Sequence, residues 1–251
     1  MRLIQKEQTV YNSKRRQPAE QKIQIEDTLR KIEALFRRES WLVCLDWRDE
    51  SDHRSMLHSL GPKNSYGRID RITNVIYVDF RTDLFAMFVH QCIHAVYPLM
   101  IERDTTILEM IMVEYMTRDQ VVRMLQLLLD NSIHQLVDHP PLVKTDIISR
   151  IERLFDGGQW LVSLDQLRGE TDLSIIRNLG RNCHGLVDEN ILILYVDFRE
   201  NLVSLFIHEC LHAIYPQMSE DDVRKKEAAT ISRLDAPQAE YLLRLMLKYR
   251  Y

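Results

Sequence analysis

Cysteine is scarce in the sequence, and its positions argue against a disulfide framework. The 251 residues include four cysteines, Cys44, Cys92, Cys183 and Cys210. Only Cys92 and Cys210 occupy corresponding places in an internal repeat, and each lies inside the same short motif. Small secreted domains that depend on disulfides carry denser, paired cysteines. We therefore expect free thiols and a cytoplasmic location.

A long apolar run and a strong net charge are also lacking. No run approaches the ~20 apolar residues that a membrane-spanning helix needs, and the N-terminal stretch has no apolar core typical of a signal peptide. The net charge of −4 offers little attraction for nucleic acid or an anionic membrane. Lys14, Arg15 and Arg16 lie in a polar stretch, residues 1–22, which we expect to be a flexible basic arm. Neither a membrane nor nucleic acid is an expected partner.

The chain contains an internal repeat. Residues 90–94 (His-Gln-Cys-Ile-His) and 208–212 (His-Glu-Cys-Leu-His) lie 118 positions apart, and a β-branched stretch precedes each of them. The same offset joins further pairs, namely Tyr77 and Tyr195, Asp79 and Asp197, Glu102 and Glu220, and Glu109 and Glu227. A repeat of this length indicates two tandem copies of one domain.

The repeat also sets the domain boundaries. We assign residues 23–130 to the first copy and residues 145–251 to the second. The intervening residues 131–144 form the linker, because they include the consecutive prolines Pro140 and Pro141.

Apolar periodicity predicts an α+β fold in each copy, with a short sheet, the motif helix and the helices after it. The elements expected in the first copy are a helix at 27–36, strands at 41–45 and 75–80, the motif helix at 83–97, and helices at 102–116 and 121–129. The second copy repeats this plan. We expect the two copies to pack against each other through their apolar last helices.

The second copy carries a His-Glu-x-x-His motif. The four-residue spacing of His208 and His212 places both imidazoles on one helix face, where they can bind one metal ion. Glu209, beside the first histidine, can take a proton from a water molecule that attacks a carbonyl carbon. We therefore predict a Zn²⁺-dependent hydrolase with Glu209 as its general base.

A catalytic zinc ion needs a third protein ligand. We expect it on the next helix, because Pro216 ends the motif helix and the following helix can fold back along it. Glu227 is the preferred ligand, since a residue two turns into that helix should return to the level of His212. Glu220 is the alternative, although acidic residues favour a first helical turn for electrostatic reasons alone.

The developing oxyanion of the substrate needs a further hydrogen-bond donor. His184 and Tyr215 are the candidates. Each also has a simpler interpretation, because Tyr215 matches Tyr97 and can serve packing, and His184 precedes a turn glycine.

The first copy keeps the candidate ligands His90, His94 and Glu109 but has Gln91 in place of the base. Glutamine cannot accept a proton at neutral pH. We therefore expect this copy to bind metal without hydrolysing substrate, so that the chain holds one or two zinc ions.

Residues 185–235 resemble a zincin metallopeptidase of the gluzincin type, and residues 67–117 do so more weakly. The arrangement of strand, motif helix and glutamate helix is similar to that of the smallest members, the minigluzincins. The resemblance implies two small zincin-like domains in tandem, with His208, His212 and Glu227 as zinc ligands. It also implies peptidase activity on a peptide or protein substrate.

A second hypothesis is a binding or regulatory protein that keeps this fold without turnover. The glutamine at position 91 favours it for one copy. Replacing Glu209 with glutamine separates the two hypotheses, because a peptidase then loses turnover while it still holds zinc.

Overall fold

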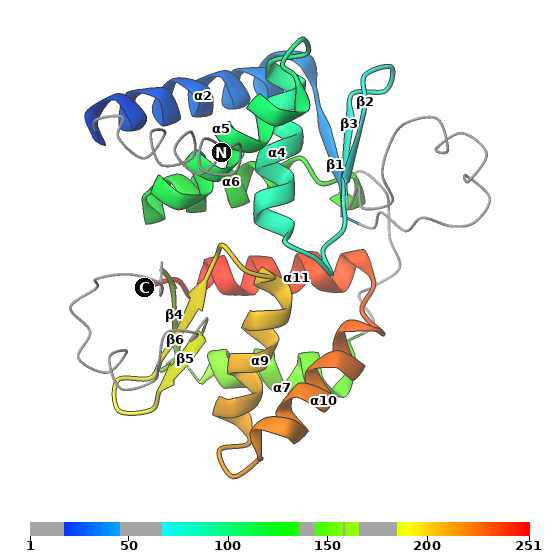
Figure 1. Ribbon diagram of the computed structural model, residues 1–251. Coiled ribbons are helices and arrows are strands. Elements are labelled where there is room, and N and C mark those ends of the chain that lie inside the picture. The colour runs from blue at the N-terminus through cyan, green and yellow to red at the C-terminus, as the bar shows by residue number, and fades with distance from the viewer. Residues whose placement is uncertain (1–17, 46–66, 136–143, 158, 166–184) are drawn as a thin grey trace, which may run out of the picture.

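The computed structural model describes residues 18–45, 67–135, 144–157, 159–165 and 185–251. Within these ranges the protein is a mixed α+β structure with eight α-helices and two three-stranded sheets. The first copy forms the upper half of Figure 1 and the second copy the lower half.

The two copies repeat the same order of elements. Those of the first copy are α2 (Pro18–Glu39), β1 (Leu42–Cys44), β2 (Gly67–Asp70), β3 (Val75–Val78), α4 (Leu84–Val96), α5 (Glu102–Tyr115), α6 (Arg118–Asp130) and the short 3-10 helix η2 (Ile133–Gln135). Those of the second copy are α7 (Asp146–Asp156), β4 (Leu161–Asp165), β5 (Gly185–Asp188), β6 (Ile193–Asp197), α9 (Leu202–Ile214), α10 (Glu220–Ile231) and α11 (Ala236–Lys248).

Both sheets have the same topology, with strand orders β1-β3-β2 and β4-β6-β5. The first strand is parallel to the central strand, and the second strand is antiparallel to it. The β2–β3 and β5–β6 hairpins turn at Asn74 and Leu192, whose φ angles are 54° and 56°. These two residues are repeat equivalents, so both hairpins use the same left-handed turn position. The second strand, β2 or β5, lies at the edge of its sheet within the described residues.

The end of each copy returns to its own sheet. Val43 N donates to Asn131 O at 2.8 Å, and Val162 N donates to Tyr249 O at 2.9 Å. Asn131 was assigned to the linker from the sequence. Its backbone instead extends the first sheet, while residues 136–143 of that linker lie outside the described ranges.

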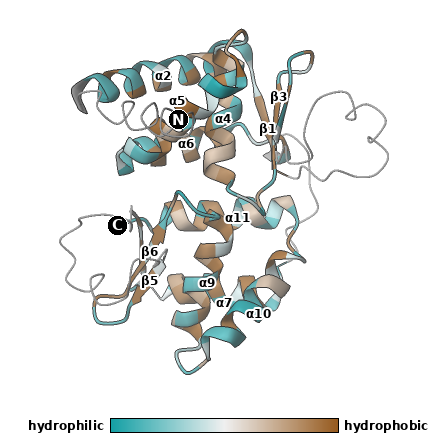
Figure 2. Cartoon of the chain, in the orientation of Figure 1, coloured by the Kyte–Doolittle hydropathy of each residue, from teal (hydrophilic) through white to brown (hydrophobic). Residues whose placement is uncertain are grey.

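The motif helices α4 and α9 are apolar along most of their length, as Figure 2 shows. A helix that is apolar on nearly every side must be buried on nearly every side. Each of the two contacts the sheet of its own copy, and they also contact each other. Phe85 on α4 meets the ring of Phe198 edge to face, with centroids 5.4 Å apart. One continuous hydrophobic core therefore extends through both copies.

Polar contacts also join the copies. Ser132 Oγ donates to Glu240 Oε2 at 2.6 Å, and both side chains are buried. Asn201 Nδ2 donates to the carbonyl oxygen of Arg81 at 2.6 Å. The last helices α6 and α11, where the seam was expected, contact each other.

Several sequence-based expectations change in detail. Helix α2 begins at Pro18, so residues 18–22, expected in a flexible arm, are helical. A capping box begins α6, because the Thr117 side chain accepts from Gln120 N while the Gln120 side chain accepts from Thr117 N. Asp83 is the residue before α4, but its side chain makes no capping hydrogen bond.

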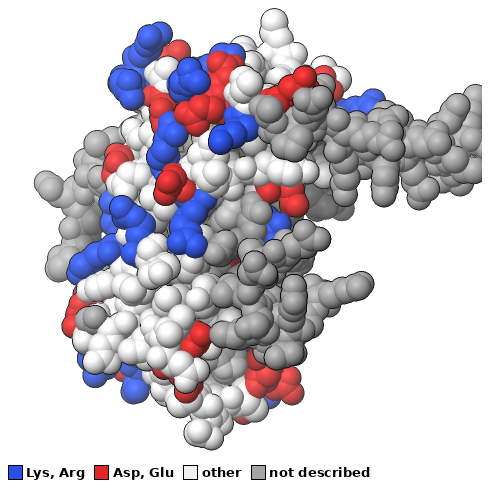
Figure 3. Space-filling model, turned by 90° about the vertical axis from the view of Figure 1, so that its left-hand side faces the viewer, with Lys and Arg blue, Asp and Glu red and all other residues white. Residues whose placement is uncertain are grey.

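Basic and acidic side chains lie interspersed on the face shown in Figure 3. No helix of the described ranges is both long enough and apolar enough to cross a membrane. Cys44, Cys92 and Cys210 form no disulfide with one another, and Cys183 lies outside the described residues.

Candidate metal centre

Helix α9 presents the second-copy motif to a cavity. Asn201 caps the helix by accepting a hydrogen bond from Ser204 N at 3.2 Å, and the chain leaves the helix just before Pro216. The helix packs against β5, β6, α7 and α10, and its face between β5 and α10 lines the cavity. His208 and His212 lie on this face.

Three potential metal ligands converge there. Nε2 of His208 lies 3.1 Å from Nε2 of His212. Glu220 Oε2 lies 3.1 Å from His212 Nε2, and Glu220 Oε1 lies 3.6 Å from His208 Nε2. Two ligands of a tetrahedral zinc ion, each at ~2.0–2.1 Å from the metal, are ~3.3 Å apart. The donor set and its spacing therefore fit a metal ion with tetrahedral coordination.

Glu227 lies on the opposite side of the His208 ring. Its Oε2 accepts from His208 Nδ1 at 2.8 Å, and its Oε1 accepts a short hydrogen bond from the Ser204 hydroxyl. This geometry reverses our preference for Glu227 over Glu220. The turn after α9 is so short that the first turn of α10 already lies level with His212, whereas Glu227 reaches back to His208 and Ser204.

The hydrogen bond that His208 donates to Glu227 defines which ring nitrogen carries the proton. A carboxylate only accepts hydrogen bonds, so Nδ1 carries the proton and the lone pair of Nε2 faces His212 and Glu220. The same hydrogen bond raises the pKa of His208, against the opposing effect of burial.

Glu209 is buried, with 5 % of its surface exposed. Burial is the main cause that raises its pKa to about 7; the charge of His208 opposes this rise, and the nearby carboxylates of Glu220 and Glu227 contribute to it. A carboxyl group with such a pKa can both accept and release a proton near neutral pH.

Gly185 is what allows Glu209 to fit. A Cβ atom on Gly185 would lie 2.1 Å from Glu209 Oε1 and 2.6 Å from its Cδ. The sequence suggested a turn glycine at this place, but Gly185 begins the edge strand β5. Only a residue without a side chain allows β5 to pass this close to the carboxylate.

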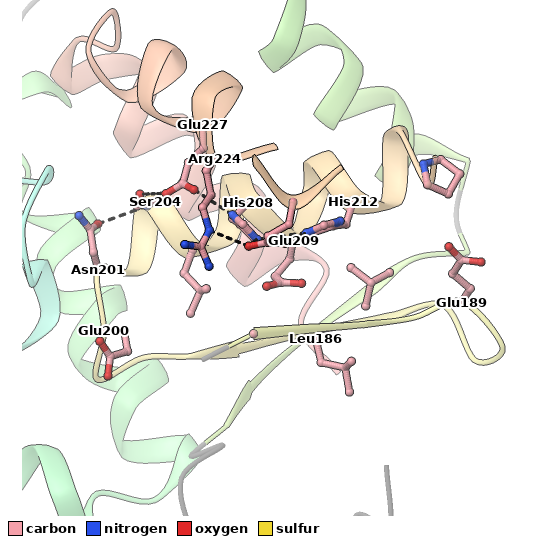
Figure 4. A pocket seen from close by; sticks show the side chains of 15 residues that line it. Leu186, Glu189, Glu200, Asn201, Ser204, His208, Glu209, His212, Arg224 and Glu227 are labelled. Atoms are coloured by element: carbon pink, nitrogen blue, oxygen red, sulfur yellow. Dashed lines mark hydrogen bonds and ion pairs between the residues drawn. The ribbon is translucent and has the colours of Figure 1, made fainter. Parts of the chain in front are cut away.

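These groups line one open cavity of about 780 Å³ (Figure 4). Its walls come from strand β5 and from helices α9 and α10. Besides the two histidines and Glu209, Glu220 and Glu227, the lining residues are Gly185, Leu186, Val187, Glu189, Glu200, Asn201, Ser204, Leu205, Pro216 and Arg224.

The first copy has an equivalent group. His90 Nε2 lies 3.2 Å from Glu102 Oε1, and His94 Nε2 lies 2.9 Å from Glu102 Oε2. Glu109 accepts from His90 Nδ1 at 2.9 Å, as Glu227 does from His208. Burial lowers the pKa of His90, but its hydrogen bonds to Glu109 and Glu102 outweigh burial and raise it overall. Here too the glutamate expected as a ligand, Glu109, contacts the other ring nitrogen.

Gln91 occupies the position of the base in the first copy and is also buried. Its Nε2 donates to Met87 Sδ at 3.6 Å. The amide therefore fills the space that Glu209 fills in the second copy, without an ionisable group.

Of the two oxyanion donors proposed from the sequence, only Tyr215 lies within the described residues. His184 lies outside the described residues. Tyr215 is not among the residues that line the cavity, and its ring faces Lys226 Nζ at 5.2 Å and Arg150 Cζ at 5.9 Å.

Sequence reasoning missed three residues of the site, Gly185, Ser204 and Arg224. Gly185 did carry a signal, because the repeat pairs it with Gly67, and a Cβ on Gly67 would likewise approach Gln91 Nε2, to 2.9 Å. Arg224 follows Glu220 by one helical turn, a spacing typical of an ion pair. Nothing in the sequence marks Ser204.

Searches of protein-family models, of curated proteins and of solved structures found no match to this chain.

Proposed function

We propose that the protein is a zinc-dependent peptidase that hydrolyses peptide bonds in its second copy, and that its first copy binds metal without turnover. The observation that carries the proposal is the convergence of His208, His212 and Glu220 beside the buried carboxyl of Glu209 in one cavity. In this assignment Glu227 is not a ligand but holds the His208 ring in place.

Zinc bound by His208, His212 and Glu220 would act as a Lewis acid and would make a water molecule nucleophilic near neutral pH. Glu209 accepts the proton of the attacking water and later delivers it to the leaving amine nitrogen. Its raised pKa suits both transfers.

The edge strand in the wall of the cavity supports a peptide as the substrate. One wall is the edge strand β5, which contributes Gly185, Leu186 and Val187. An extended peptide can add to a sheet edge through main-chain hydrogen bonds. Such pairing would lay the scissile bond across the metal group on α9.

In the first copy, His90, His94 and Glu102 offer the same donor set. We assign a second zinc ion to them. Gln91 cannot accept a proton, so this copy would hold metal as a structural element. Metal binding to such a site adds to the stability of the fold.

Elemental analysis of the dialysed protein, combined with peptide hydrolysis assays, tests the proposal. We expect about two zinc ions per chain, loss of one in His90→Ala and of the other in His208→Ala. Glu209→Gln should retain its zinc and lose about 10²- to 10⁴-fold in kcat. Absence of zinc uptake at the second copy, or an unchanged kcat in Glu209→Gln, would contradict it.

The alternative, a metal-holding protein without turnover, has one observation in its favour, namely Gln91 at the base position of one copy. It predicts zinc binding without hydrolysis of any peptide in a diverse library. Under that alternative Glu209→Gln changes no activity.

A further inference from the structure

Arg224 lies beside the metal group of the second copy, one turn after Glu220 on α10. Its Nε–H donates to Glu220 Oε1 at 2.8 Å, and the side chain extends from α10 into the cavity beside His208 (Figure 4). Among the described residues that line the cavity, Arg224 is the only lysine or arginine. The guanidinium is therefore a fixed positive charge at the place where substrate would bind.

The guanidinium still has donors for a substrate. It carries five N–H groups, and the hydrogen bond to Glu220 uses the one on Nε. Two other donors of the wall are engaged elsewhere, because the Ser204 hydroxyl donates to Glu227 and Asn201 Nδ2 donates to Arg81 O. Since 70 % of the Arg224 side chain is exposed, a ligand in the cavity can reach its Nη atoms.

Arg224 is one of several lining positions at which the two copies differ; others include Ser204, replaced by Ala86, and Glu189, replaced by Arg71. The metal group and its supporting glutamate are common to both copies. The base and the arginine differ, because Gln91 replaces Glu209 and Thr106 replaces Arg224 at the offset of 118. Thr106 donates to the carbonyl oxygen of Glu102 in its own helix, at 3.0 Å. The two groups that would act on a substrate are thus both absent from the copy proposed to be silent.

We propose that Arg224 is a catalytic residue that donates hydrogen bonds to the substrate carbonyl oxygen as negative charge develops on it. The inference rests on the proposed peptidase function. It gives Arg224 the role of oxyanion donor, for which Tyr215 does not line the cavity.

The water oxygen bonds to the carbonyl carbon while Glu209 takes one water proton, and the π electron pair moves onto the carbonyl oxygen facing Arg224. The pair then returns, the C–N bond breaks, and Glu209 delivers its proton to the leaving nitrogen. Arg224 stays protonated throughout and contributes only its charge and its hydrogen bonds. Such groups stabilise a transition state best when they are held in place before the reaction. The hydrogen bond to Glu220 does this.

The test compares Arg224→Ala, Arg224→Lys and Arg224→Thr with wild type at saturating zinc, with the zinc content of each measured. The matched control is Lys225→Ala, the next residue on the exposed side of α10. We expect kcat of Arg224→Ala and Arg224→Thr to fall about 10²- to 10³-fold, with KM changed less than about threefold. Added guanidinium ion should restore part of the kcat of Arg224→Ala, because it can enter the space left by the arginine side chain. It should not restore the kcat of Arg224→Lys, because the lysine side chain occupies that space. Lys225→Ala should behave as wild type.

Unchanged kcat in Arg224→Ala at full zinc occupancy would overturn the inference and leave the peptidase proposal standing. A loss seen only in KM, without rescue by guanidinium, would equally overturn it. A zinc-loaded wild-type chain that hydrolyses no peptide would refute the peptidase function itself and this role with it. The three outcomes are therefore distinguishable.

Discussion

His208 donates from Nδ1 to the carboxylate of Glu227 at 2.8 Å, and so turns its Nε2 towards His212 and Glu220. The first copy repeats the relationship between His90 and Glu109, at 2.9 Å. A carboxylate in this place fixes the tautomer and the orientation of a metal-binding histidine. The two glutamates of α10 consequently have different roles, one on each side of the imidazole.

These different roles predict different losses of zinc affinity. Glu220→Gln removes a proposed ligand and should weaken zinc binding more than roughly 100-fold. Glu227→Gln removes only the hydrogen bond that orients His208 and should lower the zinc affinity roughly 10- to 100-fold. Competition with a chromophoric chelator measures both. The chain should carry His90→Ala so that only the second copy is titrated. A larger loss for Glu227→Gln would restore Glu227 as the ligand.

The contact between Gly185 and Glu209 predicts a specific loss of activity. In Gly185→Ala the new Cβ would collide with the Glu209 carboxylate at 2.1 Å, so the base or strand β5 must move. A misplaced general base should lower kcat about 10²-fold or more, measured by peptide hydrolysis. Gly67→Ala, the equivalent change in the first copy, should leave kcat unchanged, and a wild-type kcat in Gly185→Ala would argue against Glu209 as the base.

Zinc affinity should depend on pH through His208. A histidine must be neutral to bind the metal, and the hydrogen bond that His208 donates to Glu227 raises the pKa of His208 above 6.5. Protons therefore compete with zinc as the pH falls through that raised pKa, and affinity should then drop roughly tenfold per pH unit for this histidine. Chelator competition between pH 5.5 and 8 measures the curve. In Glu227→Gln the midpoint should move to lower pH, and an unmoved midpoint would contradict the assigned hydrogen bond.

The hairpin turns predict a pair of opposite stability effects. Leu192 has a φ of 56°, a conformation that costs an ordinary L-residue about 1–2 kcal/mol and that asparagine tolerates better. Leu192→Asn should therefore raise the free energy of unfolding by about 1 kcal/mol. Asn74→Leu should lower it by at least as much, because Asn74 Nδ2 also donates to Glu39 O at 3.1 Å. Urea denaturation measures both, and effects of the same sign would refute the explanation.

The buried hydrogen bond between Ser132 and Glu240 should stabilise the association of the two copies. Ser132→Ala leaves one carboxylate oxygen without its donor at this position and should cost about 1–3 kcal/mol. Ser232→Ala, at an exposed helix end where Oγ donates to Ala229 O at 3.1 Å, should change stability by less than about 0.5 kcal/mol. Urea denaturation would contradict the prediction if both variants lost the same amount.

The sequence was enough to locate the local elements of the site. The spacing of His208 and His212 needs only a helix, and Thr117 and Gln120 cap their helix through neighbours in the chain. Periodicity and the repeat likewise indicated the strands and the motif helices. The histidine spacing and the helix cap depend on residues within about one helical turn of each other, where helix geometry fixes the distances.

Tertiary packing decided which glutamate faces which nitrogen. The sequence places Glu220 and Glu227 on one helix, but it does not say how the turn after Pro216 aligns that helix with α9. The structure shows that alignment in the contacts of Glu220 with Nε2 and of Glu227 with Nδ1. It likewise brings Gly185 against Glu209 and Arg224 into the cavity. Contacts between separate elements depend on how those elements pack, and about two turns of helix separate the proposed ligand from the proposed supporting residue.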